Sequence, residues 1–186
     1  MIHKGHLKEG KSLLAPYLPT TSSTSPYSEG GALYGLGIIH ANHGEGITQY
    51  LLSALNEHAA SETIQHGACL GLGVAGMASG NRAIFNSLAD VLNSDRAVAG
   101  EAAGIAIGLV MLGTGDEQAL NLLIPYAHNT QHEKIIRGIA MGIALVMYAK
   151  EAKADSLIEQ LLQDKVPIYL PIYLPIFLRA HSAILS

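Results

Sequence analysis

The chain has 186 residues, a hydrophobic content of 49% and a formal net charge of −4. This length fits a single domain, and the hydrophobic content is enough to build a buried core. With 11 Lys and Arg against 15 Asp and Glu, the chain lacks the basic surplus expected of a protein that binds nucleic acid or an anionic membrane surface. The single cysteine, Cys69, excludes an intramolecular disulfide and indicates a reducing compartment, the cytoplasm or the nucleus.

Residues 1–29 are predicted to contain half of a repeat followed by a loop. The run Ile2-His3-Lys4-Gly5-His6 resembles Ile39-His40-Ala41-Asn42-His43, and each run is followed by a pair of leucines. We therefore expect the chain to open partway through a repeat. The segment Pro16 to Ser28 is rich in Pro, Ser and Thr, which predicts a loop.

An apolar, glycine-rich motif then recurs along the chain. Gly31-Ala32-Leu33-Tyr34-Gly35-Leu36-Gly37 returns 36 residues later as Gly67-Ala68-Cys69-Leu70-Gly71-Leu72-Gly73. A third copy is Ala102-Ala103-Gly104-Ile105-Ala106-Ile107-Gly108, and Gly138-Ile139-Ala140-Met141-Gly142 aligns with its last five residues as a fourth. Glycine inside a helix costs about 1 kcal/mol relative to alanine, so these glycines need a packing reason.

Each copy is followed by a turn and then by an amphipathic helix. The first three turns contain Gly44, Gly80 and Gly115, and the fourth contains Ala149-Lys150. The apolar positions of the second and fourth amphipathic segments have helical spacing: Ile84, Leu88, Val91 and Leu92, then Leu157, Ile158, Leu161 and Leu162. Residues 30–165 are thus predicted to form four pairs, each with one short small-residue helix and one amphipathic helix. Stacked pairs bury a continuous core, which predicts an all-α solenoid.

Residues 166–186 are predicted to be a divergent, proline-rich tail. Pro167, Pro171 and Pro175 recur at every fourth residue, and this spacing forbids a continuous helix. The apolar run is also shorter than the roughly 20 residues that a membrane-spanning helix needs.

The segment Gly71 to Gly76 satisfies the dinucleotide-binding pattern GxGxxG and gives an alternative, nucleotide-binding interpretation. However, no strand pattern precedes Gly71, and the equivalent segments break the motif at His40 and Met111. Helix packing is therefore the favoured explanation of these glycines.

Three histidine pairs have a spacing that would place two imidazoles on one helical face as metal ligands. They are His3 and His6, His40 and His43, and His128 and His132. No third ligand is apparent, so we interpret them as capping or solvated side chains. Cys69 is expected to be a buried structural thiol, because no positive partner for a nucleophile accompanies it. With no GxSxG elbow either, the sequence predicts no catalytic, cofactor-binding or metal-binding residues, and no enzyme.

Two further segments give structural predictions. Gly100, Gly104 and Gly108 recur at a spacing of four, as in paired membrane helices, but the segment from Val98 to Gly113 is too short to span a bilayer. We expect this glycine stripe to pack against another helix of the stack. Pro125 falls inside the third amphipathic segment, which predicts a kink or an early end of that helix.

Two segments also carry a family resemblance: Gly100 to Gly113, and Thr130 to Gly138 with the following Gly142 to Tyr148. They closely resemble the proteasome/cyclosome repeats, and the resemblance extends in register from about Ile2 to Lys165. It implies that the chain is an arc of a toroid-shaped α-solenoid. It further implies a non-catalytic scaffold in the base of the proteasome regulatory particle, with the ATPases and non-ATPase subunits of that particle as partners and with no cofactor.

Other proteins built from these repeats remain an alternative within the resemblance. They are the second large non-ATPase subunit of the proteasome and the largest subunit of the anaphase-promoting complex. The runs Gln131-His132-Glu133-Lys134 and Leu145-Val146-Met147-Tyr148 favour the first large proteasome scaffold over both.

Overall fold

The structure is a computed structural model that describes residues 6–19, 25–41 and 43–163; from residue 160 onward it describes only the backbone. Within these residues every regular element is helical, which confirms the predicted all-α solenoid. The predicted proline-rich tail, 166–186, lies outside the described residues.

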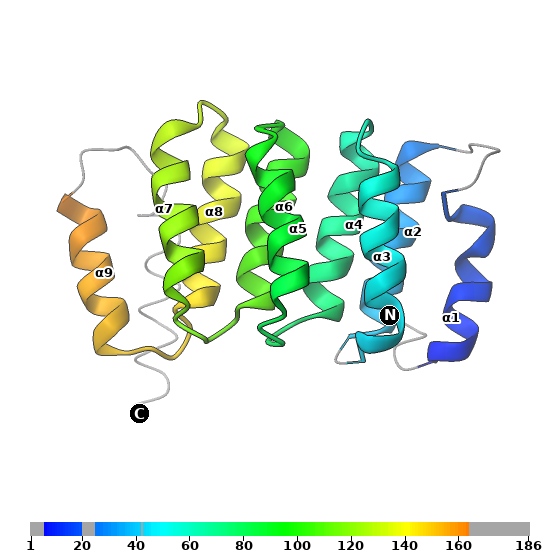
Figure 1. Cartoon of the computed structure of the whole chain (residues 1–186), viewed down its shortest axis with the longest axis horizontal. Coiled ribbons are helices and arrows are strands. Elements are labelled where there is room, and N and C mark those ends of the chain that lie inside the picture. The colour runs from blue at the N-terminus through cyan, green and yellow to red at the C-terminus, as the bar shows by residue number, and fades with distance from the viewer. Residues whose placement is uncertain (1–5, 20–24, 42, 164–186) are drawn as a thin grey trace.

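The helices form two layers that alternate along the chain (Figure 1). We call the glycine-rich layer the stacking helices: α2 (Pro26–Ile39), α4 (Glu62–Ala75), α6 (Ala97–Val110) and α8 (Glu133–Val146). The other layer contains the covering helices: α1 (Leu7–Leu14), α3 (Glu45–Glu57), α5 (Arg82–Asn93), α7 (Glu117–Asn129) and α9 (Ala152–Gln163). A 3-10 turn, Ala15–Tyr17, follows α1. Each stacking helix has 14 residues against 12 or 13 in α3, α5 and α7, so the prediction that the small-residue helices are the short ones is wrong.

The stacking helices touch one another through their backbones. A Cβ added to Gly108 of α6 would lie 2.5 Å from the Cα of Gly142 in α8. A Cβ on Gly71 of α4 would lie 2.6 Å from the carbonyl oxygen of Leu33 in α2. Real Cβ atoms do not approach neighbours so closely, so these positions need glycine for close packing. The packing reason predicted for the glycines is therefore confirmed.

The helix ends correct the predicted register of the fourth repeat. The stacking helices end at Ile39, Ala75, Val110 and Val146, which are 36, 35 and 36 residues apart. The residue equivalent to Gly104 is therefore Ala140, and the predicted alignment with Gly138 is wrong by two residues. Gly138 instead contacts Gly104 across the α6–α8 interface. Gly104 and Gly138, 34 residues apart, are thus residues that touch each other, and they do not hold equivalent positions in their repeats.

Each of the first four covering helices packs along the stacking helix that follows it in the chain: α1 on α2, α3 on α4, α5 on α6 and α7 on α8. Large apolar side chains fill the space between the two layers. The fully buried ones include Leu51, Leu55, Leu88, Leu92 and Leu123 from the covering helices, and Leu33, Leu36, Leu72, Ile107 and Ile135 from the stacking helices. The covering layer thus supplies the bulk that the glycine-rich layer lacks.

The helix starts follow local chemistry, and one of them corrects a predicted loop. Ser61, Asn81 and Asp116 accept hydrogen bonds from backbone amides in the first turns of α4, α5 and α7. Helix α2 begins at Pro26, so the predicted loop from Pro16 to Ser28 ends too late. Proline suits the first position of a helix because its missing N–H needs no partner there. Residues 20–24 lie outside the described residues.

Helix α7 continues through Pro125 to Asn129, so the predicted early end of this helix is wrong. Pro125 and Asn121, whose carbonyl loses its helical partner, both lie on the exposed face. Water can bond to that carbonyl, which makes the proline tolerable. The other predicted outcome, a kink of the helix at Pro125, stays a prediction.

The glycine stripe of α6 faces α8, as predicted. A Cβ on Gly104 would lie 2.9 Å from the carbonyl carbon of Gly138, and one on Gly100 would lie 2.7 Å from the Cδ1 of Ile135. Among the described helices, none has both the length and the apolar character needed to cross a membrane.

Substitution of Gly108 by alanine is expected to destabilise the fold by about 1–3 kcal/mol, because the new methyl group would overpack the backbone of α8. The matched control is Gly31→Ala in α2, where nothing lies within 4 Å of the added Cβ. This control is expected to be neutral or to stabilise by up to about 1 kcal/mol, since alanine favours the helix. Urea unfolding of both variants checks the difference; equal losses would show that backbone contact does not explain the glycines.

Candidate functional site

Successive repeats are joined at two edges of the stack, and the first is the edge where stacking helices end, here called the turn rim. Ala78 N–H donates to the carbonyl of Leu109 at 2.9 Å, and Gly80 N–H donates to Val110 at 3.0 Å. Gly113 and Gly115 repeat this pattern on the carbonyls of Leu145 and Val146, both at 2.9 Å. These two turns thus bind the last carbonyls of the next stacking helix, which a helix end otherwise leaves without partners.

The donors on the turn rim share a left-handed backbone, with φ of +57° at Ala78, +60° at Gly80, +66° at Gly113 and +62° at Gly115. Glycine adopts this conformation without steric cost. The predicted glycine turns are therefore confirmed at Gly80 and Gly115. Gly44 differs, because its φ is −66°.

An exposed ion pair adds to the turn rim. Arg82 at the start of α5 makes two hydrogen bonds to the carboxylate of Asp116, one of them at 3.1 Å. Asp116 also accepts from the Ala119 amide at 2.8 Å and so caps α7. The guanidinium and the cap hold the pKa of Asp116 below its usual value. The Asp116 carboxylate therefore both caps the start of α7 and holds the start of α5 through Arg82.

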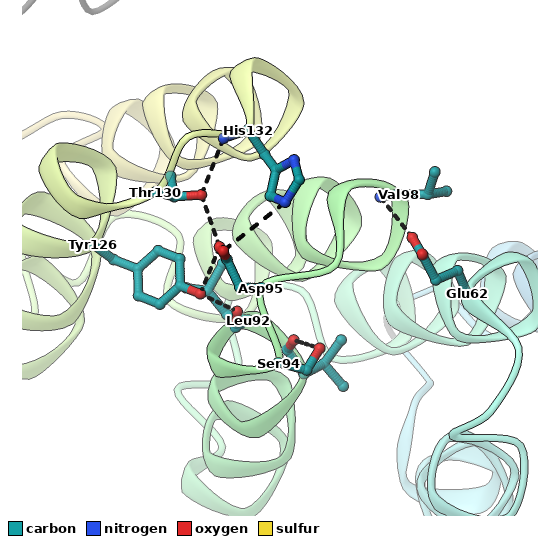
Figure 2. Close-up of polar contacts among 9 residues, drawn as sticks. Glu62, Leu92, Ser94, Asp95, Val98, Tyr126, Thr130 and His132 are labelled. Carbon is teal, nitrogen blue, oxygen red and sulfur yellow. Dashed lines mark hydrogen bonds and ion pairs between the residues drawn. The ribbon is translucent and has the colours of Figure 1, made fainter.

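The opposite edge, where each covering helix leads into a stacking helix, is here called the loop edge (Figure 2). Asp95 lies in the loop between α5 and α6 with a left-handed backbone, φ +51°. Its carboxylate accepts from the Thr130 hydroxyl at 2.7 Å and lies 3.0 Å from the Tyr126 hydroxyl, which also reaches the Leu92 carbonyl at 2.7 Å. His132 Nε2 lies 3.9 Å from the same carboxylate. Three side chains of the next repeat therefore converge on one loop.

Burial and the hydrogen bond to Asp95 raise the pKa of Tyr126 to about 12. The phenol therefore stays protonated at neutral pH and serves as a donor rather than as a base.

A second set of contacts ties α6 back to the preceding repeat. Arg96 donates to the carbonyl of Ala59 at 2.7 Å and to the side-chain oxygen of Gln65. The Glu62 carboxylate accepts from the Val98 amide at 2.9 Å, in the first turn of α6. The loop edge is thus a chain of polar contacts that runs from repeat to repeat.

The nucleotide-binding interpretation of Gly71 to Gly76 is wrong. Gly71 and Gly73 lie inside α4, buried against α2 and α6 respectively. Their faces are occupied by neighbouring backbones, so no phosphate can approach them. The helix-packing interpretation holds instead.

The histidine pairs are not brought together into one site. Among the described residues, no group of three or more His, Cys, Asp or Glu side chains is placed to hold a metal ion. His3 lies outside the described residues, and His6 and His132 stand at helix starts without a side-chain cap bond. His43 Nδ1 lies 3.1 Å from the carbonyl of Ala41. His40 is only 6% exposed, so the interpretation as a capping or solvated side chain is wrong there.

Cys69 is completely buried, as predicted. Burial raises the pKa of its thiol well above the usual value, so the thiolate that a nucleophile requires does not form at neutral pH.

The sequence did not predict the cluster of Asp95, Tyr126, Thr130 and His132, here called the Asp95 cluster. Its members come from three elements, and their spacing follows no motif. The one available signal was an Asp two residues after the end of a helix, since Asp tolerates a left-handed backbone better than most residues.

Three segments match the Proteasome/cyclosome repeat: residues 31–63, 67–101 and 102–136. The chain belongs to this family. Each matched segment contains one complete covering helix, α3, α5 or α7, and the three segments are arranged as consecutive repeats of one stack.

Several curated relatives cover almost the whole chain. The 26S proteasome non-ATPase regulatory subunit 1 homolog B of Arabidopsis thaliana is 56% identical over 171 residues, 90% of this chain and 17% of that protein. The 26S proteasome regulatory subunit rpn2 of Schizosaccharomyces pombe is 48% identical over 169 residues, 90% of this chain and 17% of that protein. The subunit 1 of Drosophila melanogaster is 50% identical over 169 residues, 90% of this chain and 16% of that protein. The chain therefore spans about a sixth of the length of these relatives.

Replacement of Asp95 by alanine is expected to lower the free energy of unfolding by about 1–3 kcal/mol. The change removes the acceptor of Thr130 and Tyr126 and leaves a left-handed alanine. Asp90→Ala is the matched control, because Asp90 is an exposed aspartate on neighbouring α5. Urea unfolding at fixed pH measures both; a loss no greater than that of the control would contradict a joining role for Asp95.

Nucleotides are expected to leave the melting temperature unchanged, because the Gly71 to Gly76 segment is buried between helices. A thermal-shift series with NAD, ATP and GTP, run beside a known nucleotide-binding protein, checks this. A concentration-dependent rise with any of the three would restore the nucleotide-binding interpretation.

Proposed function

We propose that this chain is part of a non-catalytic scaffold of the 26S proteasome regulatory particle, and that it supports assembly of the particle and ubiquitin-dependent protein degradation. The observation that carries the proposal is the sequence identity of 48–56% over 90% of the chain to regulatory subunits of the 26S proteasome. These relatives are named as regulatory, and several of them as non-ATPase, subunits.

The geometry supports a structural role. Polar side chains on the loop edge are used to bond one repeat to the next, and the glycines bring helices together. Among the described residues, the groups whose pKa values depart from normal are spread over separate elements: Arg82 and Asp116 on the turn rim, Tyr126 on the loop edge, His40 after α2, Tyr50 on α3, and His66 and Cys69 on α4. A catalytic site would instead concentrate such groups in one cleft.

Membership of another complex is the competing proposal, as a piece of the second large non-ATPase proteasome subunit or of the largest anaphase-promoting complex subunit. The relatives described above favour the first large subunit, because their names are those of subunit 1 or rpn2. The expected partners are therefore the ATPases and non-ATPase subunits of the regulatory particle, in the cytoplasm and the nucleus.

Affinity purification of the tagged chain from cells, followed by mass spectrometry, tests the partner proposal. We expect enrichment of regulatory-particle subunits over a matched control, Gly108→Leu, which should disrupt the α6–α8 contact and with it the stack. Fluorescence microscopy of the same tagged chain should show both cytoplasmic and nuclear signal. Enrichment of anaphase-promoting complex subunits, or equal recovery with the disrupted variant, would contradict the proposal.

A further inference from the structure

Two grooves on the exposed side of the covering layer have the same construction. One lies between α5 and α7 and has a volume of about 240 Å³, and the other lies between α7 and α9 and has a volume of about 310 Å³. The three helices follow one another in a single layer (Figure 1). They begin at Arg82, Glu117 and Ala152, so residues 35 positions apart are equivalent in neighbouring covering helices.

The side chains that line the two grooves recur at this spacing. Three positions are apolar in both grooves, and one holds an asparagine in both. The equivalent pairs are Phe85 and Leu120, Asn86 and Asn121, Ala89 and Ile124, Asp90 and Pro125, and Leu122 and Leu157. Because these covering helices pack against each other less closely than the stacking helices do, the same space stays open in both repeats.

Asn86 and Asn121 each place a carboxamide in a groove. Both residues are exposed, and neither side chain has a hydrogen-bond partner among the described residues. A carboxamide has two N–H donors and one carbonyl acceptor, so it can pair with both the C=O and the N–H of a peptide backbone. In a helix or a sheet those backbone groups are already bonded. The two asparagines therefore suit an extended segment whose backbone groups are free.

The grooves are also negatively charged and rich in hydrogen-bond acceptors. Asp90 lines the first groove and Glu117 the second, and neither carboxylate has an ion-pair partner among the described residues. Pro125 has no N–H, so the backbone carbonyl of Asn121 in the second groove lacks its helical donor. No lysine or arginine is among the described residues that line either groove. This charge and these acceptors favour a ligand that carries lysine or arginine.

The repeat of the grooves fits the geometry of an extended chain. Packed helices have axes about 8–10 Å apart. A polyproline II segment advances about 9 Å over its turn of three residues, and every third side chain returns to the same face. Its backbone makes no internal hydrogen bonds. Such a segment can place successive side chains in successive grooves while its backbone meets Asn86 and Asn121.

We propose that the grooves between α5, α7 and α9 bind an extended segment of a partner protein, with an apolar side chain at every third residue and lysine or arginine beside it. The apolar side chains enter the grooves over Phe85 and Leu120, and the asparagines bond to the backbone of the segment. The cations approach the carboxylates. This inference goes beyond the scaffold role and does not depend on which complex contains the chain.

Fluorescence anisotropy with the chain 1–186 tests the proposal at about 0.15 M salt, where distant charges are screened. The labelled probe peptide has three repeats of Leu-Pro-Lys, because proline favours the polyproline II conformation. One comparison peptide has Glu in place of Lys, and the other has Ser in place of Leu. We expect the probe to bind at least about tenfold more tightly than either, because each comparison peptide loses the charge or the apolar contact.

The variant Asn86→Ala/Asn121→Ala removes both carboxamides and is expected to bind the probe about tenfold more weakly than the wild-type chain. The matched control is Asn93→Ala/Asn129→Ala, which removes the exposed asparagines at the ends of the same two helices. This control should bind the probe as the wild-type chain does. Equal affinity for the Lys and Glu peptides, or equal affinity of the two variants for the probe, would overturn the proposal.

An NMR titration of the wild-type chain with the probe gives a readout that needs no variant. We expect the side-chain amide signals of Asn86 and Asn121 to shift, while those of Asn93 and Asn129 stay in place. Shifts confined to other parts of the chain would contradict the proposal. A dimer in analytical ultracentrifugation that Asn86→Ala/Asn121→Ala abolishes would equally overturn it, since the grooves would then bind a second copy of the chain.

Discussion

The structure depends on direct contact between the backbones of neighbouring stacking helices. Where Gly108 meets Gly142, and where Gly104 meets Gly138, a single added methyl group has no space. Helices this close leave no room for large side chains between them, so the apolar bulk of the core must come from a second layer. The alternation of glycine-rich and leucine-rich helices follows from this one constraint.

Close packing of small residues does not by itself fix how far one helix slides along the next. Hydrogen bonds at the two edges fix this position. On the turn rim, Gly80 and Gly115 bond to the ends of the following stacking helices, and on the loop edge Asp95 collects Tyr126 and Thr130. Directional bonds at both ends of a smooth interface set the register between repeats.

The period, the alternation of two helix types and the glycine turns could be predicted because they are local and recur. The register of the fourth repeat could not, because Gly138 and Gly142 repeat the spacing of the residues they touch, Gly104 and Gly108. The tolerance of Pro125 depends on which face of α7 meets water, and the burial of His40 depends on neighbours that only the folded chain brings together. The Asp95 cluster joins residues more than 30 positions apart, so no local sequence pattern predicts it.

The joints between repeats have the same arrangement of helices but are bonded by different residues at their edges. The glycine contact between α2 and α4 is as close as that between α6 and α8, and amide pairs bond the turns after α4 and α6 to the next stacking helix. Because the helix contact carries the cohesion and the edge bonds carry the rigidity, a joint can lose its edge bonds without separating. In a stack built this way, the stiffness of each joint depends on its own edge bonds, while the core stays continuous from repeat to repeat.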